Sequence, residues 1–240
     1  ERKVNRDFIK MLAILAMTLN HIGNILMEPG SMLQVIFVDI GYFTAITMCY
    51  FLVEGYRYTR DKARYGLRLF AFAVLSEIPY QLAFQGMLEG IGVNMMVTLF
   101  LCYLILIVRE QRWSTTGKVI LIFLLVYLTQ GRDWGVIAPL FTLLFAWAYG
   151  DRKKTAEAYG AGIALFGLNE LLWMTGAGVN TAKAFFYAVG ACAGPFLSGL
   201  VILFFYNGKR AARGRRFFTY FFYFYYPAHL VILYLLHRIL

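Results

Sequence analysis

Five ionisable side chains stand inside long apolar runs of the sequence, where they could do chemistry. Each is a histidine or a carboxylate: His21, Asp39, Glu77, Glu170 and His229. A neutral imidazole can take a proton from an attacking hydroxyl or amine, or can itself attack a reactive carbonyl. A carboxylate can orient the second ring nitrogen. Among the five, His21 is a candidate for accepting a proton, and the carboxylates of Glu77 and Asp39 lie at a comparable depth in other runs.

The surroundings of His21 favour a functional role for it. The segment from Thr18 to Asn24 places polar side chains within two helical turns, and Gly23 allows another helix to approach closely. A low-dielectric setting favours the neutral imidazole, which is the form that accepts a proton. The alternative is that the polar groups of the five runs only pair with one another and hold the protein together.

The runs that carry these residues are typical of membrane spans. Of the 240 residues, 60% are hydrophobic and only 15% are charged, which is far from the composition of a soluble domain. A helix needs about 20 mainly apolar residues to cross a bilayer. We predict an all-α, polytopic bundle in one domain over residues 1–240, with nine spans, the first one retained: 8–27, 32–53, 64–84, 93–108, 118–130, 133–149, 156–174, 183–206 and 217–237.

The basic residues test this count, because cytoplasmic loops collect Lys and Arg. All but three of the 23 fall on alternate loops: Arg2, Lys3, Arg6 and Lys10; Arg57, Arg60, Lys62, Arg64 and Arg68; Arg109, Arg112 and Lys118; Arg152, Lys153 and Lys154; and Lys209, Arg210, Arg213, Arg215 and Arg216. The N-terminus is therefore predicted inside and the C-terminus outside. We expect a multi-pass protein of a bacterial cytoplasmic membrane.

This orientation places the five ionisable groups in one layer. Four of them lie about 13 residues into spans that enter from the cytoplasm, which is roughly 20 Å of helix. Asp39 reaches the same level from the other side. We expect a shared polar chamber in the outer part of the membrane.

The net charge of +10 has two interpretations. The basic residues form short clusters between apolar runs, so topology explains them better than a nucleic-acid partner does. Five of them also lie at the inner mouths of the first three spans, where they could bind phosphates: Lys10, Arg57, Arg60, Arg64 and Arg68. The three cysteines show no metal-ligand spacing, and no metal is predicted.

Several short segments together resemble the TraX family of membrane acetyltransferases, and more distantly the acyltransferase-3 and heparan-α-glucosaminide acetyltransferase group. The matching pieces are Asn20-His21-Ile-Gly23, Phe51-Leu-Val-Glu54-Gly55-Tyr-Arg57-Tyr-Thr59-Arg60, Ser76-Glu77-Ile-Pro79-Tyr80, Asn94, Asp133-Trp-Gly135 and Tyr226-Pro227-Ala-His229. The distant group carries a basic residue, ten further residues and then a histidine in its first span, and Lys10 and His21 have the same spacing. Arg57 and Arg60 resemble the RxxR pair of that group.

The resemblance implies transfer of an acetyl group from cytoplasmic acetyl-CoA to an acceptor at the outer face, which could be a pilin-like peptide, a glycan or a lipid head group. The five basic residues would then bind the phosphates of the CoA. His21 would be the catalytic residue, as general base or as transient acyl carrier, and Glu77 or Asp39 would orient its second ring nitrogen. Six further residues would bind the acceptor or stabilise an oxyanion: Asn20, Asn94, Asp133, Glu170, Tyr226 and His229. A transporter of a small solute or ion, with a polar site in mid-membrane, is the alternative. A purely structural polar layer in a larger secretion or conjugation assembly is a third interpretation.

Overall fold

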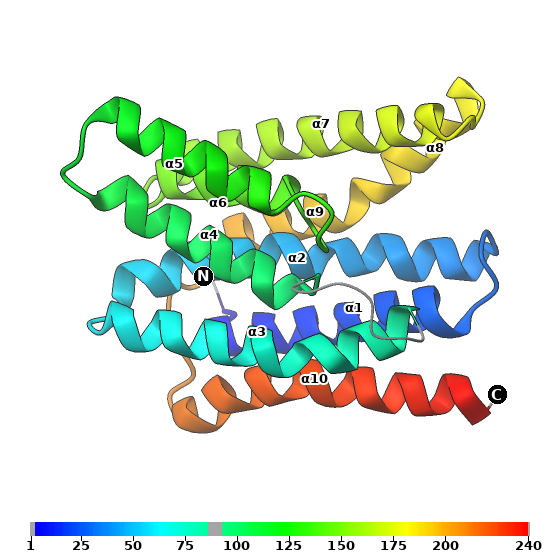
Figure 1. The fold of residues 1–240 in the computed structure, drawn as a ribbon, viewed down its shortest axis with the longest axis horizontal. Coiled ribbons are helices and arrows are strands. Elements are labelled where there is room, and N and C mark those ends of the chain that lie inside the picture. The colour runs from blue at the N-terminus through cyan, green and yellow to red at the C-terminus, as the bar shows by residue number, and fades with distance from the viewer. Residues whose placement is uncertain (1–2, 86–92, 240) are drawn as a thin grey trace. The chain divides into compact units, whose positions relative to one another are not determined.

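The computed structural model describes residues 3–85 and 93–239 and is built from helices (Figure 1). In chain order they are α1 (Arg6–Leu26), α2 (Met32–Tyr58), α3 (Lys62–Gln85), α4 (Met95–Glu110), α5 (Thr115–Leu128), α6 (Ile137–Ala148), α7 (Arg152–Gly176), α8 (Thr181–Ala191), α9 (Ala193–Leu200), the π-helical turn η1 (Val201–Phe205) and α10 (Arg215–Ile239). Across these ranges the only extended pairing is an isolated bridge between Val4 and Tyr206. The predicted all-α fold is confirmed. Arg2, counted above as cytoplasmic, lies outside the described ranges.

Side chains with short polar groups begin several of the helices. Asn5, Ser114 and Asp151 accept hydrogen bonds from backbone N–H groups in the first turns of α1, α5 and α7. The first N–H groups of a helix have no partner within it, so such caps stabilise the ends that an apolar pattern alone leaves undefined.

Five helical segments are long and apolar enough to cross a membrane: Arg6–Leu26, Met32–Tyr58, Lys62–Gln85, Thr181–Phe205 and Phe217–Ile239. Large apolar side chains such as Phe8, Leu67 and Ile232 are exposed on them. Because exposed apolar surface of this extent is suited to lipid, the chain is a membrane protein. The count of nine spans and the orientation stay predictions.

The predicted eighth span is interrupted in the structure. The helix breaks at Cys192, between α8 and α9, and ends in the π-helical turn. Pro195, which has no N–H, and the flanking Gly190 and Gly194 weaken the helix here. The predicted sixth span also begins later, because Asp133 lies in the turn before α6.

The chain divides into two compact units, and the prediction of a single domain stays a prediction. The first consists of Glu1–Met48 and Gly150–Phe222. In it α7 packs against α8 and α9 (Figure 1). A Cβ on Gly194 would collide with the α2 backbone at Asp39 and Phe43, so α9 and α2 touch through this glycine. Hydroxyl groups also link α9 to α2 and α7. The Oγ of Ser198 on α9 lies 2.9 Å from the hydroxyl oxygen of Thr47 on α2 and 3.0 Å from that of Tyr159 on α7.

The second unit consists of Cys49–Tyr149 and Tyr223–Leu240. Its α4 packs against α3, α5 and α6, and Ile105, Val108 and Leu125 form an apolar cluster there. The α10 helix meets α3 through aromatic rings, since Phe72 stacks on Tyr223 with 4.8 Å between ring centroids. These contacts fix α3 and α4, which carry most of the polar residues described next.

Candidate functional site

Glu77 and Asn94 lie together in the second unit. The Nδ2 group of Asn94 donates hydrogen bonds to Oε2 of Glu77 at 2.5 Å and to the carbonyl of Ala73 at 3.0 Å. Its Oδ1 accepts from the N–H groups of Met96 and Val97 and so caps α4. Asn94 is fully buried, and all of its hydrogen-bonding capacity is used. It therefore joins the second half of α3 to the start of α4.

Other donors also hold the Glu77 carboxylate. Gln81, one turn along α3, donates to Oε1 at 2.6 Å, and the backbone N–H of Val93 donates to the same oxygen at 3.1 Å. Together with Asn94, three donors therefore converge on the two oxygens of this carboxyl group. His21 lies in the other unit, so the predicted pairing of Glu77 with His21 stays a prediction.

Asp133 is attached to the same structure through its backbone. Its N–H donates to the carbonyl of Val93 at 2.8 Å, and its carbonyl accepts from the hydroxyl of Thr98 at 2.7 Å. The next residue, Trp134, has a φ of 58°, a conformation that is uncommon outside glycine. A Cβ on Gly135 would come within 2.7 Å of the Thr129 carbonyl, so this turn requires glycine. The Asp-Trp-Gly motif thus builds a tight turn that fixes the backbone of Asp133 beside Val93 and Thr98.

Two tyrosines complete this polar group. Glu77 and Asp133 both act electrostatically on the hydroxyls of Tyr80 and Tyr226, which places the four residues close together. Tyr226 is buried on α10. The structure thus brings together four predicted site residues, Glu77, Asn94, Asp133 and Tyr226, and adds Tyr80 and Gln81. We call these six residues the Glu77 cluster.

His229 lies one turn beyond Tyr225 on α10 and is buried. Its Nδ1 donates to the carbonyl of Tyr225 at 2.9 Å, and its ring stacks on that of Tyr225. Because a carbonyl only accepts, Nδ1 is the donor in this contact. The carbonyl and ring of Tyr225 therefore fix the orientation of the His229 ring on α10.

In the first unit, His21 is buried on α1 beside a firm contact with α2. The neighbouring Asn20 donates to the carbonyl of Val38 at 2.9 Å, and Asn24 donates to Oδ1 of Asn20. Any side chain larger than that of glycine at position 41 would collide with Asn20. Asn20 thus fixes α1 against α2 at the level of His21.

The other two carboxylates of this unit lie near each other. Asp39 on α2 and Glu170 on α7 are half-buried and interact electrostatically, and both act on Cys192 at the break between α8 and α9. A Cβ on Gly190 would come within 2.9 Å of Oδ2 of Asp39. The structure thus brings Asp39 and Glu170 together around the interrupted helix. The predicted roles of both residues stay predictions.

The five basic residues proposed for phosphate binding do not behave alike. Lys10 lies over the ring of Phe222, Arg68 over that of Tyr65, and Arg64 pairs with Asp61 at 3.3 Å. Arg60 is exposed. Arg57 donates to Oε1 of Glu110 at 3.0 Å. A sequence pattern of cations alone does not reveal that one of them is held by a carboxylate from another helix.

Glu110 is the centre of that arrangement. Lys62 donates to its Oε2 at 2.5 Å and Tyr56 to the same oxygen at 2.8 Å. Glu110 lies two residues beyond the apolar stretch that ends at Val108. Its partial burial would raise its pKa, but the hydrogen bonds from Lys62 and Tyr56 outweigh this and lower the pKa below the usual 4.5. Glu110 is therefore an anion at neutral pH.

Comparison with known proteins decides the family. A family model described as TraX protein matches residues 5–237, which is nearly the whole chain. The chain belongs to the TraX family. A probable fimbrial assembly protein, FimC of serogroup H1 from Dichelobacter nodosus, is 33% identical over 168 residues, which cover 65% of this chain and 68% of that protein. No solved structure gives a significant match.

The resemblance to the TraX family that the short sequence segments indicated is therefore confirmed. The more distant relation to the acyltransferase-3 group stays a prediction. Two buried or paired carboxylates of the second unit had no predicted role. Glu54, in one of the TraX-like segments, is only 3% exposed, and Glu110 holds two cations. The sequence feature that could have pointed to Glu110 is its position as an acidic residue at the end of an apolar run.

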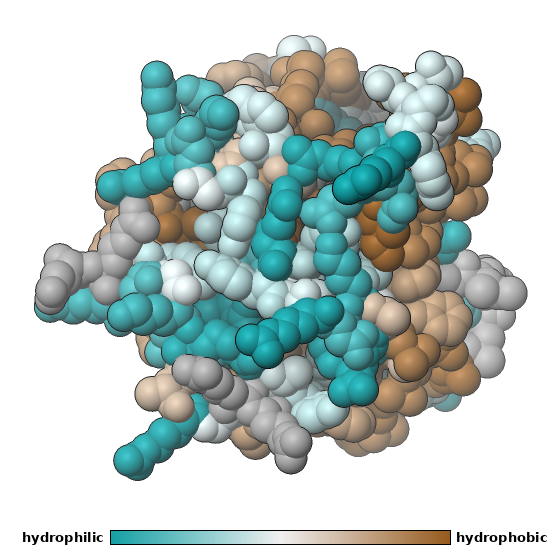
Figure 2. Space-filling model, turned by 90° about the vertical axis from the view of Figure 1, so that its left-hand side faces the viewer, coloured by the Kyte–Doolittle hydropathy of each residue, from teal (hydrophilic) through white to brown (hydrophobic). Residues whose placement is uncertain are grey.

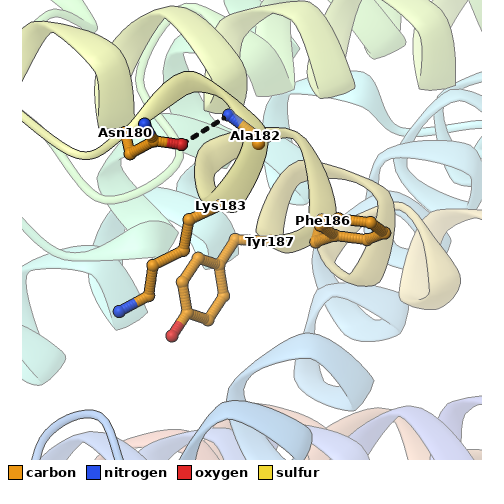
Figure 3. Close-up of a pocket in the computed structure, with 5 residues that line it drawn as sticks. All are labelled: Asn180, Ala182, Lys183, Phe186 and Tyr187. Carbon is orange, nitrogen blue, oxygen red and sulfur yellow. Dashed lines mark hydrogen bonds between the residues drawn. The ribbon is translucent and has the colours of Figure 1, made fainter.

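The TraX-family chain also has a hollow of about 560 Å³ at the start of α8, lined by Asn180, Ala182, Lys183, Phe186 and Tyr187 (Figure 3). Lys183 and Tyr187 project from one side of the helix, and Asn180 accepts a hydrogen bond from the N–H of Ala182. This hollow contains no predicted site residue. Within residues 3–85 and 93–239, no group of three or more His, Cys, Asp or Glu side chains could hold a metal ion.

Proposed function

We propose that this TraX-family chain is a membrane-embedded acyltransferase that moves an acetyl group from cytoplasmic acetyl-CoA to an acceptor at the outer face. The observation that carries the proposal is the burial of the His21 imidazole in the first membrane helix, at the level where Asn20 fixes α1 to α2. A general base needs such a fixed position and shelter from water. Lys10, Arg57, Arg60, Arg64 and Arg68 are the proposed contacts of the CoA phosphates.

The proposed transfer needs one base and one site for the developing negative charge. The amine or hydroxyl of the acceptor attacks the thioester carbonyl, and its proton passes to the His21 imidazole. The carbon–sulfur bond then breaks, and the CoA thiolate leaves and takes up that proton. Alternatively His21 carries the acetyl group transiently. Asn94, Asp133, Tyr226 and His229 are suited to holding the acceptor or the oxyanion.

The acceptor class to test first is a peptide amine. The relative from Dichelobacter nodosus is named a probable fimbrial assembly protein, which supports a fimbrial or pilin-like subunit over a glycan or lipid head group. We expect the purified protein to transfer labelled acetyl from acetyl-CoA to a peptide with a free N-terminal amine. A peptide whose amine is already acetylated is the control.

Binding of CoA separates this function from the alternatives. CoA at 100 times its Kd should stabilise the folded protein by about 2.7 kcal/mol, seen as a higher melting temperature in detergent. Adenosine is the control, because it lacks the phosphates and the pantetheine arm. Absence of any stabilisation by CoA would exclude the acyltransferase, and uptake of a small solute by proteoliposomes without CoA binding would favour the transporter.

The proposed function also requires nine spans with the N-terminus inside and the C-terminus outside. We expect alkaline phosphatase fused after Arg238 to be active in intact bacteria, and the same enzyme fused after Lys153 to be inactive. The physical reason is the excess of Lys and Arg on alternate loops. Equal activity of the two fusions would contradict the orientation on which transfer across the membrane depends.

A further inference from the structure

The end of the second unit that carries the α2–α3 and α4–α5 connections is strongly hydrophilic (Figure 2). Tyr56 and Arg57 come from the end of α2, Lys62 from the start of α3 and Glu110 from the end of α4. The side chains of Arg57, Lys62 and Glu110 are 40%, 45% and 31% exposed, so a solute can reach them.

Three donors from two other helices converge on the Glu110 carboxylate at this end. Both oxygens of Glu110 are bound, one by Arg57 and the other by Lys62 and Tyr56. Arg109, next to Glu110 in the sequence, also interacts electrostatically with Arg57 and Glu110. Arg109 itself is fixed, because it donates to the carbonyl of Ala146 at 2.7 Å.

Aromatic rings hold the two cations in place. The ammonium of Lys62 lies 4.1 Å from the centroid of the Tyr56 ring, and the guanidinium of Arg57 lies 5.9 Å from that of Tyr149. Such contacts orient cations without neutralising them. An arginine fork, an ammonium and a phenol directed at one point are the donors that a phosphate group uses.

From this geometry we infer that Tyr56, Arg57 and Lys62 form a phosphate-binding site that the Glu110 carboxylate occupies when no ligand is bound. The inference rests on the proposed function for its natural ligand, a phosphate group of CoA. It adds Tyr56 and Lys62 to the five residues that the sequence predicts as phosphate contacts. Glu110 acts as a competing anion: a phosphate binds when the carboxylate swings out, and the carboxylate returns when the phosphate leaves.

Glu110→Gln tests the inference, because the amide keeps the shape and loses the charge. We expect the variant to bind both CoA and inorganic pyrophosphate about tenfold more tightly than the unmodified protein, measured by calorimetry in detergent. Glu157→Gln is the matched control, since it makes the same change of charge on an exposed side chain of α7, where no proposed CoA contact lies. Its affinities should change less than twofold.

A second variant covers the case in which Glu110→Gln does not fold. Lys62→Gln in the unmodified protein should weaken binding of pyrophosphate about tenfold. Unchanged affinities in Glu110→Gln, in a protein that binds CoA, would overturn the inference and leave the proposed function standing. Tighter binding of pyrophosphate by Glu110→Gln, in a protein that binds no CoA, would support the anion site and overturn the proposed function.

Discussion

Replacing His21 with alanine is expected to lower the rate of acetyl transfer at least about 100-fold while leaving CoA binding within twofold. A positioned general base contributes about 10²- to 10⁴-fold to a rate, and alanine offers no group to take the proton. The phosphates of CoA would be bound at the cytoplasmic end, roughly 20 Å of helix away from residue 21, so donor binding should not depend on the imidazole. The measurement is transfer of labelled acetyl to a peptide amine, with CoA affinity recorded on the same sample.

Two further variants make the His21 result interpretable. His237→Ala is the matched control, because His237 is exposed near the end of α10 and has no predicted role. It should transfer at the unmodified rate. His21→Gln keeps polar groups on α1 and guards against a loss of folding in the alanine variant. If either His21 variant melts like the unmodified protein and still transfers acetyl at a normal rate, His21 is not the base.

The membrane helices could be predicted because their physics is local. Each needs an apolar stretch of sufficient length, and five of the predicted spans coincide with helices that are long and apolar enough to cross. The break at Cys192 could not be predicted in the same way, although the sequence has Gly190, Gly194 and Pro195 around it. Glycine in a membrane helix also serves close packing, and Gly194 does this against α2, so the residue type does not distinguish the two uses.

The candidate site could be predicted only in part, because its pairings depend on which helices pack together. Depth along a span singled out Glu77, and the TraX-like motif singled out Asn94. Their contact follows from the packing of α3 on α4, which neither residue reveals by itself. Glu110 shows the limit more clearly. In sequence it is one acidic residue among basic loop residues, and only the fold shows three donors directed at it.

The Glu77 cluster gives the largest expected effect on stability. Asn94→Ala removes two donors and an acceptor that serves two backbone N–H groups, all from a fully buried site. Loss of a cap costs about 0.5 to 2 kcal/mol. Each buried group left without a partner, such as the Ala73 carbonyl, adds about 1 to 3 kcal/mol. We therefore expect Asn94→Ala to lower the free energy of unfolding by about 3 kcal/mol or more, measured by denaturant titration in mixed micelles.

Asn180→Ala is the control that separates capping from the contact with Glu77. Asn180 also begins a helix, but its side chain is exposed and accepts only from the N–H of Ala182. It should cost about 1 kcal/mol or less. Asn94→Asp adds a second comparison, because it keeps the cap and replaces the amide donor to Glu77 by a second carboxyl group. Its stability should fall as far as that of Asn94→Ala if the contact with Glu77 dominates, whereas a loss no larger than that of Asn180→Ala would mean that Asn94 only caps α4.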